Sequence, residues 1–355
     1  MPKITKVAIL DDYQSTSTSA FSQLVSSLSN TDHVLEITPF PETLNPQDPA
    51  QKAALIERLI PYEIISTMRE RTPFPADVLS ALPNLKLLLT TGMRNASLDI
   101  EAAKRHGVVV AGTVNQKAVL SPDSTTQHTW ALILGLARHV VRDHNAVTVN
   151  KRWQGETLAT GLPGKTLGLL GLGRLGGATA RIAVLAFNMR ILAWSTSLTQ
   201  EKADETAESL GLAKGSIAVA NSKEDLFRKA DILSVHYVLS DRSRGIVGKK
   251  ELEVMKPTAL LVNTSRGPLI DEDALLDVLE KGGIRGAALD VFNTEPLPFN
   301  SRWRTTGWGR DGRSELLLSP HMGYGEETNI GEWYEQTAEN VGRWIKGDEV
   351  KWRLV

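Results

Sequence analysis

The chain of 355 residues contains no cysteine, which excludes disulfide bonds, thiolate metal sites and cysteine nucleophiles. It also lacks any apolar stretch near the roughly 20 residues that a membrane helix needs. Its start, MPKITKVAILDDYQ, has an apolar run of strand length rather than the core of a secretion signal. A charge excess is missing too, because 40 basic and 41 acidic residues leave a net charge of −1. Binding to nucleic acid or to an anionic membrane is therefore not expected, and we predict a cytoplasmic protein.

The order of apolar and amphipathic segments indicates two α/β domains, each with a doubly wound parallel sheet. A chain of this length is about twice the usual domain size. Short apolar runs alternate with helical patterns, which is typical of βα units. The expected strands are KVAIL, EIISTM, LKLLLTTG and VVVAGT in the first third, and TLGLL, RILAWS, IAVA, DILSVHY, ALLVNTS, GAALDV and ELLLS after Lys165.

Two long helices and one long loop are also expected. Residues 121–144 predict one helix that is opened by Ser121 and Pro122, and EETNIGEWYEQTAENVGRWIKG predicts a helix after the last strand. Residues 298–314 are polar and glycine-rich but carry two tryptophans. This segment is either a plain surface loop or a lid or interface loop, since tryptophan is costly to leave in water.

The segment GKTLGLLGLGRLGG places three glycines between a strand pattern and a helical pattern. Gly171 permits a tight turn, Gly173 lets backbone amides approach a pyrophosphate, and Gly176 lets the helix pack closely on the strand. The phosphates then meet the positive end of the helix. A run of glycines alone is weak support, but its position within a series of βα units predicts a dinucleotide site.

Arg266, Glu295 and His321 each follow a strand-like run or its loop. The carboxyl ends of parallel strands share one crevice, so the three side chains can converge although they are far apart in the chain. Taken singly, they are explained equally well as a surface cation, a turn acid and a packed loop residue. Together they suit hydride transfer, because an arginine fork can hold a substrate carboxylate and a histidine paired with a carboxylate can exchange the proton of a carbonyl or hydroxyl.

At these positions the sequence resembles the D-isomer-specific 2-hydroxyacid dehydrogenase family. The resemblance covers essentially the whole chain, in the family's order: RERTPFP, TTGMRNASLDIEAA, HTWALILGLAR, GKTLGLLGLGRLG, NTSRGPL, ALDVFNTEPLP and SPHMGYGEE. It implies a Rossmann dinucleotide-binding domain inserted into a flavodoxin-like catalytic domain that the C-terminal helix closes. The expected boundaries are 1–116 and 323–355 for the catalytic domain and 117–322 for the dinucleotide-binding domain.

The resemblance also implies an enzyme that reduces 2-oxo acids to D-2-hydroxy acids, or catalyses the reverse. Arg266 would bind and polarise the 2-oxo acid, His321 would be the acid/base, and Glu295 would be its partner; no metal is expected. The other implied roles are substrate carboxylate binding for the amides of Met93 and Arg94, pyrophosphate binding for Arg174 and Leu175, the nicotinamide site for Thr264 and Gly323, the nicotinamide amide for Asp290, and either the cofactor cleft or a core or surface role for His236.

Some positions depart from the family's pattern and some alternatives stay open. Gln127 stands where an acid is usual, and Val238 stands where proline follows in the His-x-Pro pattern. The five histidines other than His236 and His321 are interpreted as structural. A dinucleotide-sensing protein that acts by binding partners is the alternative function. Formate oxidation is disfavoured by Glu295, because the formate-oxidising relative on this fold pairs glutamine with the histidine. Phosphoglycerate oxidation with a regulatory domain is also disfavoured, because the chain ends soon after the closing helix.

The strand after the glycine turn ends in WSTS, without the acid that selects NAD. Such an acid binds the ribose 2′-OH and repels the 2′-phosphate of NADP. Ser195, Thr196 and Ser197 offer hydroxyl donors instead, and Lys202 lies close in sequence. We therefore expect NADP(H) to be favoured, with NAD(H) possible; a plain turn that accepts either cofactor is the alternative.

Two further expectations concern the substrate and the assembly. The side chains placed to shape the pocket suggest a substrate larger than glyoxylate; they are Met93, Arg94, Met322 and Tyr324, with Trp303 and Trp308 of the long loop as further candidates. The helix over residues 121–144 is apolar on more than one face, which predicts a homodimer built on it. Burial between the two domains of one chain is the alternative. The apolar positions are Trp130, Leu132, Ile133, Leu134, Leu136 and Val140.

Overall fold

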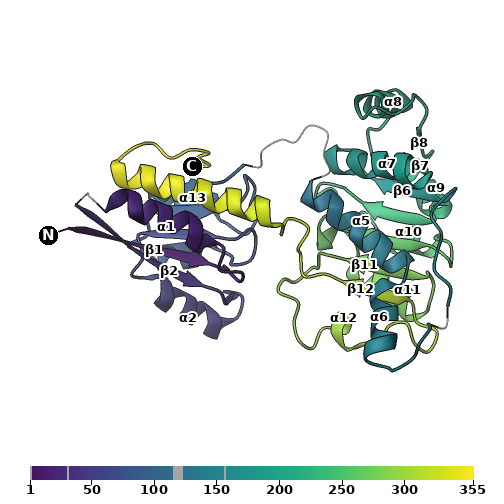
Figure 1. The fold of residues 1–355 in the computed structure, drawn as a ribbon, viewed down its shortest axis with the longest axis horizontal. Coiled ribbons are helices and arrows are strands. Elements are labelled where there is room, and N and C mark those ends of the chain that lie inside the picture. Colours follow the sequence, from purple (N-terminus) through teal and green to yellow (C-terminus); the bar gives the residue numbers. More distant parts are fainter. Residues whose placement is uncertain (1, 30–31, 115–122, 156) are drawn as a thin grey trace. The chain divides into compact units, whose positions relative to one another are not determined.

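The structure is a computed structural model that describes residues 2–29, 32–114, 123–155 and 157–355. The chain divides into two compact units (Figure 1). Unit 1 comprises Met1–Lys117 and Gly325–Val355, and unit 2 comprises Ala118–Tyr324. The expected boundary between residues 116 and 117 lies outside the described residues. Among the helices of the described ranges, none has the length and apolar character needed to cross a membrane.

The sheet of unit 1 has five parallel strands in the order β2-β1-β3-β4-β5. This is the flavodoxin-like strand order, so the predicted α/β class is confirmed for this unit. The strands β3 and β4 are buried along their whole length, as continuous apolar runs require. The strands are β1 (Lys3–Leu10), β2 (His33–Phe40), β3 (Ile64–Thr67), β4 (Leu87–Thr90) and β5 (Val109–Ala111).

The edge strand β2 is absent from the sequence-based prediction. Its sequence, HVLEITPF, has no continuous apolar run, and its side chains are half-buried or exposed. Pro39 is tolerated because edge strands leave one set of amides unpaired. The strand is set by its pairing with β1, whose register runs from Lys3 opposite His33 to Leu10 opposite Phe40. A partner distant in the chain, rather than local pattern, therefore determines this element.

Helices cover the sheet of unit 1, and the C-terminal helix α13 packs along α1 (Figure 1). The buried face of α13 includes Ile330, Trp333, Tyr334 and Val341, and the helix ends at Gly347 in the left-handed conformation. This matches the predicted final helix. The helices of unit 1 are α1 (Ser17–Leu28), α2 (Pro49–Leu59), α3 (Ala76–Ser80), α4 (Ile100–Arg105) and α13 (Glu327–Lys346).

The sheet of unit 2 has seven parallel strands in the order β12-β11-β10-β9-β6-β7-β8. This is the Rossmann order extended by one strand, and all seven strands coincide with predicted apolar runs. The order reverses between β6 and β9, which is where ligands of such sheets bind. The strands are β6 (Thr166–Leu170), β7 (Arg190–Trp194), β8 (Ile217–Val219), β9 (Ile232–Val235), β10 (Leu260–Asn263), β11 (Gly286–Leu289) and β12 (Glu315–Leu318).

The prediction of one helix over residues 121–144 is wrong in the described part of that segment. Asp123 caps the helix by accepting a hydrogen bond from the Thr126 amide, whereas Ser121 and Pro122 lie outside the described residues. The helix is interrupted at His139, whose backbone is left-handed with φ of 58°. The His139 side chain is buried and its Nδ1 lies 2.7 Å from Glu315 Oε2. This contact with a distant strand, and not a local glycine or proline, accompanies the break.

The helices of unit 2 flank its sheet, and the loop of residues 298–314 is largely exposed but places Trp303 in the core. Trp303 is 3% exposed, and its ring lies 6.1 Å from that of Trp308. Trp303 therefore belongs to the core of unit 2, and the partly buried Trp308 packs against it. The helices are α5 (Ser124–Ala137), α6 (Val140–Thr148), α7 (Arg174–Phe187), α8 (Gln200–Ser209), α9 (Lys223–Lys229), α10 (Lys249–Glu253), α11 (Glu272–Glu280), α12 (Arg302–Thr305) and the 3₁₀ turn η1 (Gly267–Leu269).

Candidate active site

The glycine turn joins β6 to α7 at the reversal of strand order. Gly171 has φ of +102°, and a Cβ there would lie 2.6 Å from the carbonyl oxygen of His236. A Cβ on Gly176 would lie 2.3 Å from the carbonyl oxygen of Gly171. Gly173 is the N-cap of α7 and has open space around the position of a Cβ. Two glycines thus allow close packing, and the third leaves the helix N-terminus accessible to a phosphate.

Arg174 and Leu175 begin α7, so their amides belong to the first turn of that helix. The Arg174 side chain is 74% exposed and pairs with Asp123, the residue that caps α5. A backbone position in the first turn and an exposed guanidinium both suit binding of a pyrophosphate. The residues present therefore fit the phosphates of a dinucleotide.

The end of β7 carries hydroxyl groups and no acid. The Tyr237 hydroxyl lies 3.1 Å from Thr196 Oγ1 and accepts a 3.4 Å hydrogen bond from the Thr196 amide. Lys202 Nζ donates a 3.3 Å hydrogen bond to the carbonyl oxygen of Ser197. Ser195 precedes these residues at the same strand end. Tyr237, which follows β9, is a residue that the sequence pattern did not single out.

His236 follows β9 and lies against the glycine turn. Its Nε2 is 2.9 Å from Ser234 Oγ. Burial lowers the pKa of His236 to about 4, and the Asp123 carboxylate opposes this effect only in part. The ring is therefore neutral near pH 7, and its backbone shapes the turn through the contact with Gly171.

Glu295 and His321 lie side by side, although they follow different strands. His321 Nδ1 is 2.5 Å from Glu295 Oε2, and Glu295 Oε1 accepts a 2.8 Å hydrogen bond from the Phe292 amide. Both carboxylate oxygens are thus engaged, which holds the imidazole in one orientation. The Tyr324 ring meets the His321 ring edge-on at 6.0 Å. His321 itself is left-handed, with φ of 55°.

Arg266 and Thr264 follow the neighbouring strand β10. The carbonyl oxygen of Arg266 accepts a 3.0 Å hydrogen bond from Asn263 Nδ2. The Arg266 side chain donates from Nη1 to the Ser265 carbonyl at 2.8 Å. Thr264 Oγ1 lies 2.7 Å from Thr129 Oγ1 on α5. Because β10, β11 and β12 are adjacent and parallel, the residues after them share one edge of the sheet.

Asp290 follows β11 and is 1% exposed. Its Oδ1 accepts a 2.8 Å hydrogen bond from the Met322 amide, and its Oδ2 accepts a 2.9 Å bond from the Gly323 amide. Burial by itself would raise the pKa of Asp290, but hydrogen bonds from His128, Ser319 and the Met322 amide lower it below its ordinary value. His128, interpreted from the sequence as structural, thus contacts a candidate site residue, and the sequence analysis did not predict this contact.

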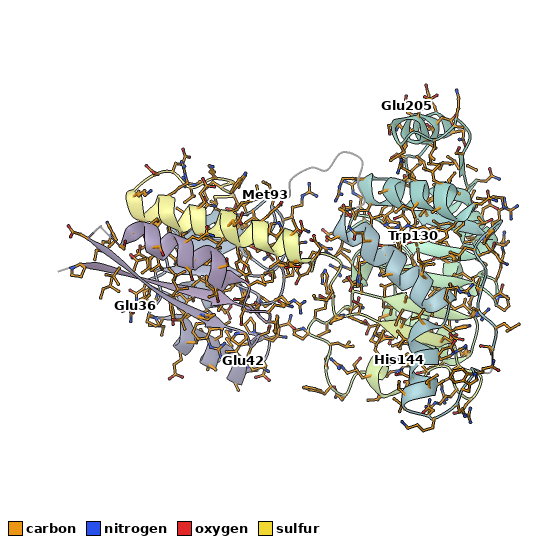
Figure 2. The ribbon with its side chains drawn as sticks, in the orientation of Figure 1. Glu36, Glu42, Met93, Trp130, His144 and Glu205 are labelled. Carbon is orange, nitrogen blue, oxygen red and sulfur yellow. The ribbon has the colours of Figure 1, made fainter. Side chains whose placement is uncertain are left out.

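Met93 and Arg94 lie in unit 1, in the turn after β4. Both are exposed, Met93 to 39%. Figure 2 labels Met93 in unit 1. The turn is held by Gly92, whose φ is +84° and whose amide donates to Thr113 Oγ1 at 2.8 Å. The Arg69 guanidinium occupies the space where a Cβ of Gly92 would lie. A cation thus lies against the turn predicted to bind a carboxylate, which the sequence pattern did not reveal.

Comparisons with known proteins agree with this arrangement. The family model described as D-isomer specific 2-hydroxyacid dehydrogenase, NAD binding domain, matches residues 130–323. The chain is 37% identical over 278 residues to a glyoxylate reductase of Aeropyrum pernix, with 76% of each chain covered. It is 32% identical over 284 residues to a D-3-phosphoglycerate dehydrogenase of Bacillus subtilis, which covers 79% of this chain but 49% of that protein.

A solved structure resembles the whole chain. The crystal structure of a phosphoglycerate oxidoreductase from Vibrio cholerae O395 superposes with a TM-score of 0.81 at 34% identity. The superposition covers 97% of this chain and 99% of that one. The likeness therefore includes both units and not only the matched nucleotide-binding segment.

Proposed function

Because the chain belongs to the D-isomer specific 2-hydroxyacid dehydrogenase family, we propose that it reduces a 2-oxo acid to the D-2-hydroxy acid, or catalyses the reverse, with a nicotinamide cofactor. The observation that carries this proposal is the contact between His321 Nδ1 and Glu295 Oε2. It lies at the carboxyl edge of the sheet whose glycine turn suits a dinucleotide. A protein that only sensed a dinucleotide would have no need of this pair.

In the proposed reaction each residue of the site has a separate task. When bound, the reduced nicotinamide supplies the hydride. His321 enters the step protonated and donates from Nε2 to the oxygen of the 2-oxo group, because its Nδ1 is bonded to Glu295. The Glu295 carboxylate stabilises the protonated ring before the transfer. Arg266 binds the substrate carboxylate and polarises the oxo group through its guanidinium.

The turn of unit 1 supports substrate binding in this proposal. The amides of Met93 and Arg94 offer hydrogen bonds to the substrate carboxylate, and Arg69 adds positive charge beside the same turn. We propose that Met322 and Tyr324, which follow His321 in unit 2, contact the side chain of the substrate. We propose a substrate with a side chain larger than that of glyoxylate, although the Aeropyrum pernix relative is named a glyoxylate reductase.

We propose that NADP(H) is the favoured cofactor and that NAD(H) is also accepted. The end of β7 carries hydroxyls at Ser195 and Thr196, with the Tyr237 hydroxyl beside Thr196, and no acid that would repel a 2′-phosphate. Gly171, Gly173 and Gly176 provide the turn for the pyrophosphate in either case.

We also propose a cytoplasmic homodimer, on different grounds from those of the sequence analysis. The buried apolar residues of α5 pack within unit 2, among them Trp130, whose ring stacks on that of Phe187. Six large apolar side chains on α6 and after it are exposed, and we propose that a second copy of the chain covers them. They are Val140, Val141, Val147, Val149, Trp153 and Leu158.

The proposed function is tested by assaying the purified protein with a panel of 2-oxo acids and with both reduced cofactors. The panel includes glyoxylate, hydroxypyruvate, pyruvate and larger aliphatic and aromatic 2-oxo acids. We expect turnover with a substrate larger than glyoxylate, with the D-hydroxy acid as product. Tight binding of a cofactor without turnover of any oxo acid would contradict the proposal and favour a sensing role.

A further inference from the structure

A second pair of a histidine and a carboxylate lies beside the proposed catalytic pair. His128 on α5 has its Nε2 3.1 Å from Asp290 Oδ1 and 2.9 Å from Ser319 Oγ. The His128 side chain is 23% exposed, whereas that of Asp290 is 1% exposed. The carboxylate is therefore buried, and it depends on protein donors for its hydrogen bonds.

Asp290 joins His128 to the loop that carries His321. The Met322 and Gly323 amides, which follow His321 directly in the chain, both donate to the Asp290 carboxylate. His321 is left-handed, a conformation that is unfavourable for a residue with a side chain. Such a conformation persists only where surrounding contacts hold it. The two bonds to Asp290 supply such contacts immediately after the residue.

We infer that His128 is a positioning residue for His321 and that it acts through Asp290. Glu295 orients the imidazole of His321. The hydrogen bonds from His128 to Asp290, and from the Met322 and Gly323 amides to Asp290, hold the backbone of the loop that carries His321. His128 donates from Nε2 to Asp290 Oδ1, which keeps the carboxylate turned so that each oxygen receives one amide of the loop. The inference concerns residues of unit 2 alone, and it rests on the proposed role of His321.

The position of α5 explains why a residue so distant in sequence can have this role. The buried face of α5 includes Thr129 and Trp130, one and two residues beyond His128. Thr129 Oγ1 contacts Thr264 Oγ1 beside β10, so this turn of the helix is anchored to the sheet. His128 thus reaches Asp290 from a rigid element, as positioning of a catalytic group requires.

The experiment compares His128→Ala, His128→Gln and His144→Ala. His144 is an exposed histidine on α6 (Figure 2) and serves as the matched control. We expect His128→Ala to lower kcat by about 10-fold to 10²-fold, as small displacements of a catalytic group do, with KM changed less. His128→Gln retains an N–H donor and should recover most of the rate, while His144→Ala should match the wild type.

A second readout uses the protein without cofactor or substrate. The proton between His321 Nδ1 and Glu295 should give a downfield signal in the proton NMR spectrum, assigned by its loss in His321→Ala. We expect this signal to shift or broaden in His128→Ala and in Asp290→Asn, and to be unchanged in His144→Ala. Asp290→Asn keeps the shape of the side chain, so it provides the test if His128→Ala does not fold.

The two proposals fail in different ways. If His321→Ala keeps wild-type turnover, the proposed function is wrong regardless of His128. If His321→Ala abolishes turnover but folded His128→Ala keeps both the wild-type kcat and the NMR signal, the inference about His128 is overturned. A loss of rate in His128→Gln equal to that in His128→Ala would also contradict it, because the hydrogen-bond donor would then be irrelevant.

Discussion

His321 and Glu295 are 26 positions apart in the chain, yet the Nδ1 of one lies 2.5 Å from the Oε2 of the other. They meet because β11 and β12 are paired in parallel, with Leu289 opposite Leu318. Each side chain belongs to the loop that follows its strand, so both emerge at the same edge of the sheet. The pairing of two strands therefore builds the acid/base pair.

Replacing His321 by Ala should lower kcat by about 10²-fold or more, since general acid–base groups contribute rate factors of this size. Glu295→Gln keeps a hydrogen-bond acceptor but removes the charge, and we expect a smaller loss of kcat together with an altered pH profile. Steady-state kinetics across pH measure both effects. A His321→Ala enzyme with near-normal kcat and an unchanged pH profile would end this assignment.

Replacing Arg266 by Lys should lower kcat/KM by about 10²-fold, mainly through a raised KM. Lysine keeps the positive charge but loses the fork that binds a carboxylate through two hydrogen bonds. Arg190→Lys, at an exposed position at the start of β7, is the matched control and should behave as the wild type. Equal KM values for both variants would show that Arg266 does not bind the substrate carboxylate.

Cofactor preference should respond to the end of β7. Ser195→Asp introduces a charge that repels a 2′-phosphate, so the ratio of kcat/KM for NADPH to that for NADH should fall by about 10-fold or more. Tyr237→Phe removes the hydroxyl beside Thr196 and should lower kcat/KM with NADPH more than with NADH. Ser209→Asp, which adds the same charge at the end of α8, is the control. A wild type clearly better with NADH would contradict the proposed preference.

Burial of His236 should make stability depend on pH. Its pKa is about 4 in the folded chain and about 6.5 when unfolded, so the unfolded chain binds more protons between these values. The contribution of neutral His236 to the free energy of unfolding is therefore fully present above pH 6.5, and it is lost as the pH falls toward 4. Between pH 7 and 5 the loss is about 2 kcal/mol.

Urea titrations at several pH values test this dependence. The variant His236→Asn does not titrate, so its free energy of unfolding should fall less between pH 7 and 5 than that of the wild type. The exposed His144 offers the control His144→Asn, which should lose as much stability as the wild type over this range. Identical pH dependence in His236→Asn and the wild type would rule out this source of acid sensitivity.

The assembly can be measured by light scattering at micromolar concentration, where we expect the mass of a dimer. Replacing the exposed Trp153 and Leu158 together by Ser should shift the protein toward monomer, since an interface loses affinity when its apolar contacts are removed. Changing the exposed Leu185 of α7 to Ser is the control. A monomeric wild type would contradict the proposed homodimer.

Local pattern predicted much of unit 2. Buried parallel strands require continuous apolar runs, so all seven strands of its sheet are visible in the sequence. The dinucleotide turn requires glycines at fixed spacing, and the structure shows why for Gly171 and Gly176, where a Cβ would collide with backbone atoms. The strands and the glycine turn can be predicted from the sequence because each depends on residues that are neighbours in the chain.

The sequence by itself determined the α/β class, the glycine turn and the position of Arg266, Glu295 and His321 after their strands, because these follow from short-range periodicity and residue chemistry. Tertiary structure alone decided the edge strand β2, the break at His139 and the bond between His128 and Asp290. That bond joins residues 162 positions apart. Contacts of this kind depend on how helices and strands pack, and no local pattern records which distant side chain a residue will meet.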